Sequence, residues 1–197
     1  MIIIFDFDGI INKADYFSVQ YEKDFGISQA TISEFFAQDF EKCAIGQTNI
    51  KTVLPPYLAK WKWPNSVESF LAYWFKNDVK LDIELLNFVE KLKKEAYYVV
   101  LASQQEVYRR NYIWHKLSLN KKFDAFYCSC DVGYLKSDER FYQKMLQDLQ
   151  AKNKDISERS IIFFDDSPEF VAAAKKSGIA AYLIKENKEI FAFFGKK

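Results

Sequence analysis

Short apolar runs recur along the chain, and each is followed by a turn signal or a polar stretch. The first run, residues 2–6, is rich in isoleucine and phenylalanine and is followed closely by a glycine. A run that is apolar at successive positions is typical of a strand with both faces buried, as in the middle of a parallel sheet. The same reasoning predicts five strands, at residues 2–6, 97–102, 124–128, 160–165 and 180–184.

Between these runs, apolar residues recur at helical spacing. Residues 83–95 carry Leu86, Val89 and Leu92 three positions apart, which places them on one face of a helix. Residues 168–176 begin at a proline, which suits the first turn of a helix, and end close to a glycine. Two more helices are predicted at residues 105–117 and 138–150. Strands that alternate with helices predict an α/β fold, a doubly wound parallel sheet of the Rossmann-like type.

One stretch interrupts this alternation. About seventy residues separate the first strand from the helix before the second strand, whereas ordinary connections take only a few. The stretch is dense in phenylalanine, tyrosine and tryptophan, so it is expected to pack rather than to remain a flexible linker. We predict an α-helical cap over residues 14–79, broken into short helices at Pro55-Pro56 and Pro64, inserted into a core made of residues 1–13 and 80–197. Most of the aromatic side chains are expected to form the interior of the cap.

Acidic pairs follow two of the predicted strands. Asp6 and Asp8 stand two positions apart, so both side chains leave the first strand on the same side, and Asp165 and Asp166 end the fourth run. The carboxyl ends of parallel strands are where α/β proteins bind ligands. Carboxylates gathered there repel one another unless a cation or a shared proton lies between them, and oxygen ligands favour Mg²⁺. An Asp-x-Asp-Gly sequence by itself also suits a solvated loop after a strand.

Four segments, in this order, resemble the motifs of the haloacid dehalogenase (HAD) superfamily. They are Asp6-Phe7-Asp8-Gly9, then Ser103 after the second predicted strand, then Lys136 in Gly133-Tyr134-Leu135-Lys136-Ser137-Asp138, and finally Phe164-Asp165-Asp166-Ser167. Together they span nearly the whole chain, and four ordered motifs are far more specific than one. The chain is most similar to the small phosphatases of this superfamily that carry a helical cap after the first motif.

The resemblance implies a role for each motif. Asp6 is the expected nucleophile, and Asp8 is the expected general acid and base. In the dehalogenating branch the second acid of the first motif is not Asp, so Asp8 favours phosphate chemistry. The residues expected to bind the substrate phosphate are Gly9, Ser103, Gln104 and Lys136.

The resemblance also implies a metal site with Mg²⁺ as the cofactor. Its expected residues are Asp6, Asp8, Asp165 and Asp166. Asp6 and Asp166 are expected to contact the metal directly, with Asp165 in a supporting position. Departures from the residues common in the family, such as Gln104 after the second-motif serine, remove no chemical group that the mechanism needs.

Composition narrows the class of protein. With 28 basic and 27 acidic residues the charge is balanced, so no nucleic-acid surface and no polybasic membrane patch is expected. The three cysteines are an odd number, and Cys128 and Cys130 stand too close in sequence for an ordinary disulfide. We expect reduced thiols in a cytoplasmic protein, without a cleaved leader, since its removal would take Asp6 away. The single histidine, His115, argues against a serine–histidine hydrolase.

The sequence therefore predicts a Mg²⁺-dependent phosphatase that hydrolyses a small phosphorylated metabolite, such as a sugar phosphate, through an aspartyl phosphate. Two alternatives stay open. One is a phosphomutase of the same superfamily, in which the cap reorients a bisphosphate. The other is a non-catalytic regulatory protein that binds a phosphorylated ligand. The expected partner is a small-molecule phosphate ester, with no nucleic acid and no membrane, and the cap carries no signature that identifies it.

Overall fold

A single parallel sheet forms the centre of the computed structural model, which describes residues 1–152 and 160–195. Its strands are β1 (Ile2–Asp6), β2 (Tyr98–Ser103), β3 (Ala125–Cys128), β4 (Ile161–Asp165) and β5 (Ala180–Leu183). They lie in the order β3-β2-β1-β4-β5, and all neighbours are parallel. The five predicted strands are confirmed, each to within one residue at either end, and so is the doubly wound α/β fold.

Strand β1 lies in the middle of the sheet, where both of its faces are buried. Ile2 pairs with Tyr98 of β2 on one side and with Ile161 of β4 on the other. Because side chains alternate along a strand, Ile3 joins the hydrophobic cluster on one face of the sheet and Ile4 joins the cluster on the other. This arrangement explains why the run is apolar at every position before Asp6.

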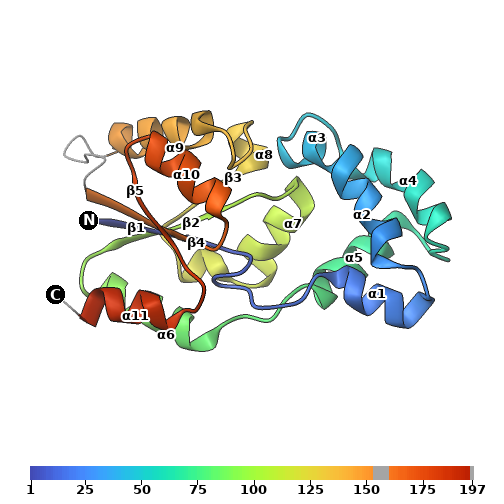
Figure 1. Cartoon of the computed structure of the whole chain (residues 1–197), viewed down its shortest axis with the longest axis horizontal. Helices are drawn as coiled ribbons and strands as arrows, with labels where there is room; N and C mark the ends of the chain where they lie inside the picture. Colours follow the sequence, from blue (N-terminus) through green and yellow to red (C-terminus); the bar gives the residue numbers. More distant parts are fainter. Residues whose placement is uncertain (153–159, 196–197) are drawn as a thin grey trace.

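Helices cover both faces of the sheet (Figure 1). One face is covered by α6 (Ile83–Lys94) and α11 (Lys188–Gly195), the other by α9 (Glu139–Lys152) and α10 (Pro168–Lys176). The predicted helix at 105–117 is instead a short helix α7 (Val107–Asn111) that continues as a π-helical turn (Tyr112–Lys116). Two further short helical segments, Leu119–Lys121 and α8 (Ser129–Val132), flank β3. Helix α11 was not predicted.

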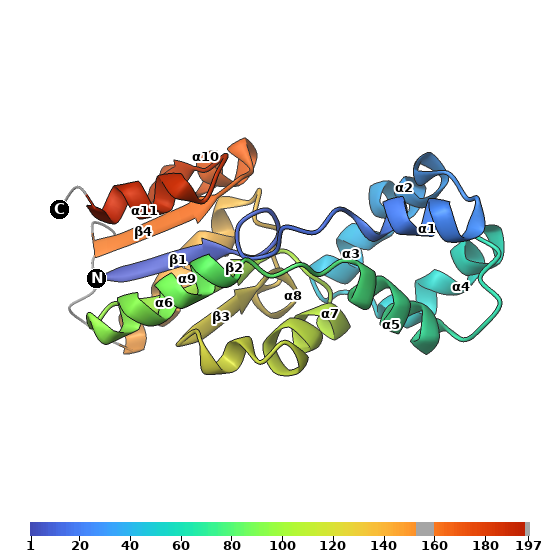
Figure 2. The ribbon, with the colours of Figure 1, turned by 90° about the horizontal axis from the view of Figure 1, so that it is seen from below.

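Five helices between β1 and α6 form the predicted cap beyond the carboxyl edge of the sheet (Figures 1 and 2). They are α1 (Phe17–Phe25), α2 (Gln29–Gln38), α3 (Phe40–Ala44), α4 (Ile50–Lys60) and α5 (Val67–Asn77). Their aromatic side chains, among them Tyr21, Trp61 and Trp74, pack into a hydrophobic cluster that is separate from the two beside the sheet. The domain limits at 14–79, and at 1–13 with 80–197, stay a prediction.

The prediction that Pro55 and Pro56 break the cap helices is wrong, because both lie inside α4. A proline in a helix interior lacks an N–H donor and costs about 3 kcal/mol. Helix α4 nevertheless buries Ile50, Leu54 and Leu58 in the cap cluster. Each large apolar side chain contributes roughly 1.5–3 kcal/mol when fully buried, so packing outweighs the local preference.

The chain passes between core and cap twice, and the two passages are bonded to each other. The backbone N–H of Lys13 donates to the carbonyl of Lys80 at 2.8 Å. The side chain of Asn12 joins the same two segments, because its oxygen accepts from Lys80 N at 2.7 Å and its nitrogen donates to the Asp78 carbonyl at 2.8 Å. Figure 2 shows the two segments running together from the sheet toward the cap. The carboxyl edge of the sheet is therefore tied to the base of the cap.

The three cysteines are free, as expected. The sulfur atoms of Cys128 and Cys130 lie 3.5 Å apart, well beyond the roughly 2.05 Å of a disulfide bond. Within the ranges that the structure describes, we find no helix that combines the length and the apolar character needed to cross a bilayer.

Candidate active site

Three aspartates meet at the carboxyl edge of the sheet. Because β1 and β4 are neighbours in register, Asp6 at the end of one strand lies beside Asp165 and Asp166 at the end of the other. Each of the three offers a carboxylate oxygen within 4.8 Å of the other two. Asp6 and Asp165 are buried, whereas Asp166 is exposed. The sheet thus brings together three of the four acids that the sequence assigns to a metal site.

Lys136 reaches this cluster from the loop between α8 and α9. Its side chain is fully buried, and its ammonium nitrogen lies 2.5 Å from Asp6 Oδ1 and 2.6 Å from Asp165 Oδ2. The backbone N–H of Lys136 donates to the side-chain oxygen of Gln104 at 3.0 Å. Gln104, which the sequence assigns to phosphate binding, therefore supports the loop that carries the lysine.

The buried charges shift one another's pKa. Burial raises the pKa of Asp6 well above its usual value and Asp165 adds to the effect, while Lys136 opposes it. Burial lowers the pKa of Lys136, but the carboxylates of Asp6 and Asp165 outweigh it and raise that pKa overall, so the lysine is protonated. Partial burial and the neighbouring Asp165 raise the pKa of Asp166. One ammonium group faces three carboxylates, and an all-oxygen set with excess negative charge fits a hard divalent cation such as Mg²⁺.

Gly9 allows the turn after β1 to approach this cluster. Its φ is +81°, in the left-handed region, and a Cβ atom built on it would overlap the carboxylate of Asp166. Only glycine fits both the conformation and the space. Ser103, at the end of β2, is buried, and its hydroxyl accepts a hydrogen bond from Gln105 Nε2 at 2.9 Å. The predicted phosphate-binding residues thus line the same edge of the sheet as the aspartates.

Asp8 lies outside the group of three carboxylates, and its own carboxylate is bound by three donors. Asn12 Nδ2 and Arg109 Nη2 lie 2.9 Å and 3.2 Å from Oδ1, and Gln105 Nε2 lies 2.6 Å from Oδ2. The side chain of Asp8 is 44 % exposed, so it remains accessible while these donors bind it. Asn12, Gln105 and Arg109 were missed in the sequence. The one available signal was that a carboxylate beside other carboxylates needs hydrogen-bond donors.

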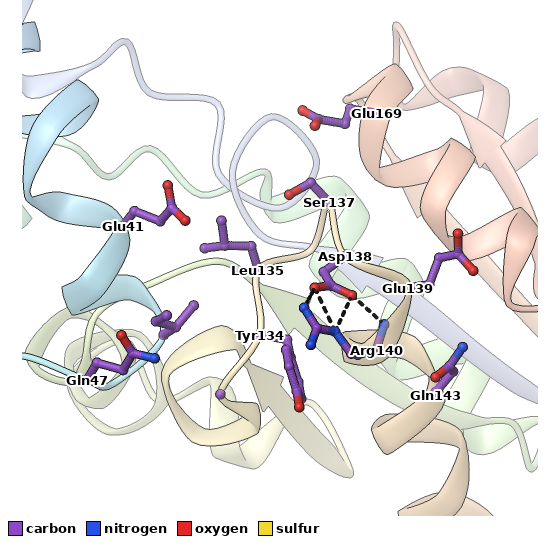
Figure 3. A pocket seen from close by; sticks show the side chains of 12 residues that line it. Glu41, Gln47, Tyr134, Leu135, Ser137, Asp138, Glu139, Arg140, Gln143 and Glu169 are labelled. Carbon is purple, nitrogen blue, oxygen red and sulfur yellow. Dashed lines mark hydrogen bonds and ion pairs between the residues drawn. The ribbon is translucent and has the colours of Figure 1, made fainter.

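A cavity of about 780 Å³ opens between the cap and the core next to the lysine loop (Figure 3). Its cap side is formed by Glu41, Ile45 and Gln47, and its core side includes Leu135, Ser137 and Glu169. Leu135 and Ser137 flank Lys136 in sequence, so the cavity borders the loop whose lysine binds the aspartates. None of the four aspartates is among the lining residues that the structure describes.

The family model of the haloacid dehalogenase-like hydrolases matches residues 3–184, which includes all four motifs and the cap. The chain belongs to this family. Membership in the HAD hydrolases agrees with the parallel sheet, with the helical cap after the first motif and with the acidic cluster at the sheet edge. It makes the protein a hydrolase by family, and it confirms the family resemblance inferred from the motifs.

Solved HAD structures share the fold over nearly their whole length. A HAD family enzyme of Bacteroides thetaiotaomicron in complex with magnesium is 20 % identical, with a TM-score of 0.79 over 98 % of this chain and 96 % of that one. The same enzyme with magnesium and inorganic phosphate is 19 % identical, with a TM-score of 0.75 over 92 % of each chain. A HAD-like family hydrolase of Porphyromonas gingivalis is 20 % identical, with a TM-score of 0.77 over 98 % of this chain and 97 % of that one. At these identities the likeness establishes the fold.

Proposed function

We propose that this HAD hydrolase is a Mg²⁺-dependent phosphatase that acts on a small phosphorylated metabolite, such as a sugar phosphate, through an aspartyl-phosphate intermediate. The observation that carries the proposal is the surroundings of Asp6. Its carboxylate contacts the buried ammonium of Lys136 and shares one cluster with Asp165 and Asp166. A second, separately bound carboxylate, Asp8, follows two residues later. Phosphoryl transfer needs a nucleophilic oxygen, compensating positive charge and a proton donor, and these residues supply them.

In the first half of the reaction, the Asp6 carboxylate attacks phosphorus and forms a P–O bond. The bond between phosphorus and the ester oxygen breaks, and its electron pair remains on that oxygen, which takes the proton of the Asp8 carboxyl group. Lys136 stays protonated and offsets negative charge beside Asp6. The products of this half are the free alcohol and phosphorylated Asp6.

In the second half, a water molecule attacks phosphorus and gives its proton to the Asp8 carboxylate. The P–O bond to Asp6 breaks, its electron pair restores the Asp6 carboxylate, and inorganic phosphate leaves. Asp8 ends the cycle protonated, ready for the next ester. Its exposed fraction and its position directly before Gly9 are compatible with contact to both the leaving oxygen and the water.

Asp6 and Asp166 would bind Mg²⁺ directly, with Asp165 in support, and the bound metal would neutralise charge on the phosphate oxygens. The Asp8 carboxylate, which the sequence also assigned to the metal site, would not bind the metal directly, because it lies outside the group of three carboxylates and Asn12, Gln105 and Arg109 already donate to its oxygens. The HAD enzyme of Bacteroides thetaiotaomicron has been solved with magnesium and inorganic phosphate, which supports Mg²⁺ as the metal and a phosphate ester as the substrate.

The size of the cavity beside the Lys136 loop is compatible with a small molecule, although none of the four aspartates is among its described lining residues. Ligand pockets for small molecules measure roughly 300–1,000 Å³, and the cavity of about 780 Å³ between cap and core falls in that range. Its cap-side residues would contact the part of the substrate beyond the phosphate, so the cap would set specificity.

The test is phosphate release from nitrophenyl phosphate with Mg²⁺, in the wild type and in Asp6→Asn. Asparagine keeps the shape of the side chain but removes the nucleophilic carboxylate, so turnover should fall by at least about 10³-fold. Asp24→Asn is the matched control, because Asp24 lies exposed on α1 and should leave turnover unchanged. Chelation should stop the wild type, and Mg²⁺ should restore it.

Each rival function has its own outcome when the same assay is repeated with a sugar monophosphate and its bisphosphate as well as with nitrophenyl phosphate. A phosphomutase would convert a sugar monophosphate to its isomer in the presence of a bisphosphate and release little inorganic phosphate. A non-catalytic binder would bind inorganic phosphate and turn over neither ester. Either result, or full activity in Asp6→Asn, would overturn the proposed function.

A further inference from the structure

Arg109 is a buried cation that no motif of the sequence accounts for. It lies on α7, directly after the strand that ends in Ser103, and only 2 % of its side chain is exposed. Moving a charged group out of water is costly unless the group is paired and hydrogen-bonded. The identity of its partners therefore indicates what the guanidinium does.

Two carboxylates from different parts of the chain neutralise Arg109. Its Nη1 lies 2.9 Å from Asp78 Oδ2, and its Nη2 lies 3.2 Å both from Asp8 Oδ1 and from the backbone carbonyl of Asp78. Asp78 is itself buried, and Trp74 Nε1 donates to the same oxygen at 3.1 Å. The guanidinium also lies about 6.0 Å from the ring centres of Phe7 in the core and Phe75 in the cap. Arg109 thus sits between the cap and the core with its orientation fixed on several sides.

The pair with Asp78 alone would satisfy the charge of Arg109. Nη2 of Arg109 nevertheless also contacts Asp8, which neutralisation of the arginine does not require. It is a third donor to the Asp8 carboxylate, beside the side-chain amides of Asn12 and Gln105. An aspartate side chain has two rotatable bonds, so a partly exposed carboxylate would otherwise sample several rotamers. The three donors approach both oxygens of the carboxylate and therefore favour a single rotamer of Asp8.

We propose that Arg109 is a positioning residue that orients the Asp8 carboxyl group for proton transfer, with Asp78 as the anion that keeps the guanidinium in place. The inference rests on the proposed function, in which Asp8 protonates the leaving oxygen and deprotonates water. Proton transfer requires a heavy-atom distance of roughly 2.6–3.2 Å, and a misplacement of about 1 Å costs on the order of 10²-fold in rate. The acidic partners of Arg109 are Asp8 and Asp78, neither of which belongs to the cluster of Asp6, Asp165 and Asp166, so its effect is expected to be carried by Asp8.

The test compares two esters that differ in their need for an acid. Nitrophenyl phosphate releases a stable anion and needs little protonation, whereas an alkyl phosphate releases an alkoxide and depends on the acid. The rate of the first turnover is measured for both by rapid quench with excess Mg²⁺. Arg109→Leu should slow alkyl ester cleavage by about 10–100-fold, while the first turnover of nitrophenyl phosphate stays within about 3-fold of the wild type. The later turnovers of both esters should slow, because hydrolysis of the phosphorylated Asp6 also uses Asp8.

The neighbouring Arg110→Leu is the matched control. Arg110 lies on the same helix but pairs with Asp131 at the surface, where its Nε lies 2.7 Å from Asp131 Oδ2. Arg110→Leu should leave the first-turnover rates of both esters unchanged. Arg109→Lys and Asp78→Asn serve where Arg109→Leu does not fold. Lysine keeps the positive charge but offers one nitrogen in place of the two guanidinium nitrogens, and Asp78→Asn removes the anion that holds Arg109. Both variants should therefore slow cleavage of the alkyl ester selectively, by a smaller factor than Arg109→Leu.

The outcomes separate the inference from the function on which it rests. A wild type that cleaves both esters, with variants that lose both equally in the first turnover or lose neither, would overturn the positioning role alone. A wild type that cleaves neither ester would overturn the proposed function and the inference with it. Selective loss of alkyl ester cleavage supports the inference.

Discussion

The most direct test of the buried charge cluster is removal of its buried ammonium group, by Lys136→Met. Methionine is an uncharged side chain nearly as long as lysine, and it leaves Asp6 and Asp165 without their ammonium partner. The three side chains are at most 7 % exposed, and the nitrogen lies 2.5 Å and 2.6 Å from the two oxygens. At an effective dielectric constant of about 20, each contact provides roughly 6–7 kcal/mol of attraction, most of which burial of the charges offsets. Removal of one partner from such a buried pair typically destabilises a protein by about 3–5 kcal/mol.

The assay is urea unfolding, followed by circular dichroism with a chelator present. With a urea dependence of about 1–3 kcal/mol per molar, the midpoint of Lys136→Met should fall by roughly 1–5 M. Lys152→Met is the matched control, because Lys152 pairs with Asp148 at 2.6 Å while the two side chains are 59 % and 44 % exposed. An exposed pair of this kind contributes about 0.5 kcal/mol or less. If both variants unfolded at the same urea concentration, the account of a charge cluster dependent on Lys136 would be refuted.

The pH dependence gives a second, independent check. Burial raises the pKa of Asp6 already in the wild type, and loss of Lys136, which lowers it, should raise it further. A carboxyl group whose pKa is raised by folding stabilises the protein below its unfolded pKa, and that contribution is lost as the pH rises through the folded pKa. The loss of stability caused by Lys136→Met should therefore become smaller as the pH is lowered through the folded pKa of Asp6. A deficit that grew on acidification would contradict the sign of the argument.

Two further predictions concern Gly9 and Glu106. Gly9→Ala should reduce stability by about 1–3 kcal/mol and raise the Mg²⁺ concentration needed for activity, because its Cβ would displace Asp166. Gly26→Ala is the control, because Gly26 also has a positive φ of +68° but open space around its Cβ. It should show only the cost of backbone strain and leave the Mg²⁺ requirement unchanged. Burial raises the pKa of Glu106 from 4.5 to about 6, so its contribution to stability is present below about pH 4.5 and is lost as the pH rises through about 6. The free energy of unfolding of the wild type, measured relative to Glu106→Gln, should therefore fall by about 2 kcal/mol between about pH 4 and pH 7, and a difference that is flat with pH would refute this reading.

The strands and the acidic edge could be predicted because local pattern determines them. A run such as Ile2-Ile3-Ile4-Phe5, apolar at every position, is compatible with few structures other than a strand buried on both faces. Once β1 and β4 are strands of one parallel sheet, their carboxyl ends meet, and Asp6, Asp165 and Asp166 must gather there. Helix α11 was missed because its aromatic residues fit a strand as well as a helix. Its state follows from packing, for example of Phe191 on Phe88.

The partners of Asp8 could not be predicted, since they depend on which distant segments the fold brings together. Arg109 and Asp8 are 101 positions apart in the chain, and no spacing relates them. The pattern also did not distinguish Gln104 from Gln105. Successive side chains point in different directions after β2, so Gln104 supports the Lys136 loop and Gln105 reaches Asp8. Pro55 and Pro56 were predicted to break a helix because proline disfavours a helix interior. Both lie inside α4, where burial of apolar side chains in the cap outweighs this local preference.

The central place of β1 has a consequence for how the chain folds. Ile2 pairs with Tyr98 and Ile161, so β1, which is synthesised before the cap, acquires its first neighbour only after the whole cap has been synthesised, and its second much later. Contacts of such long sequence separation slow folding, because a large loop must close before they form. Until then β1 presents an apolar segment with both edges unpaired, which favours aggregation. The cap helices contact one another within a short stretch of chain and can pack earlier, so synthesis itself orders assembly from the cap toward the sheet.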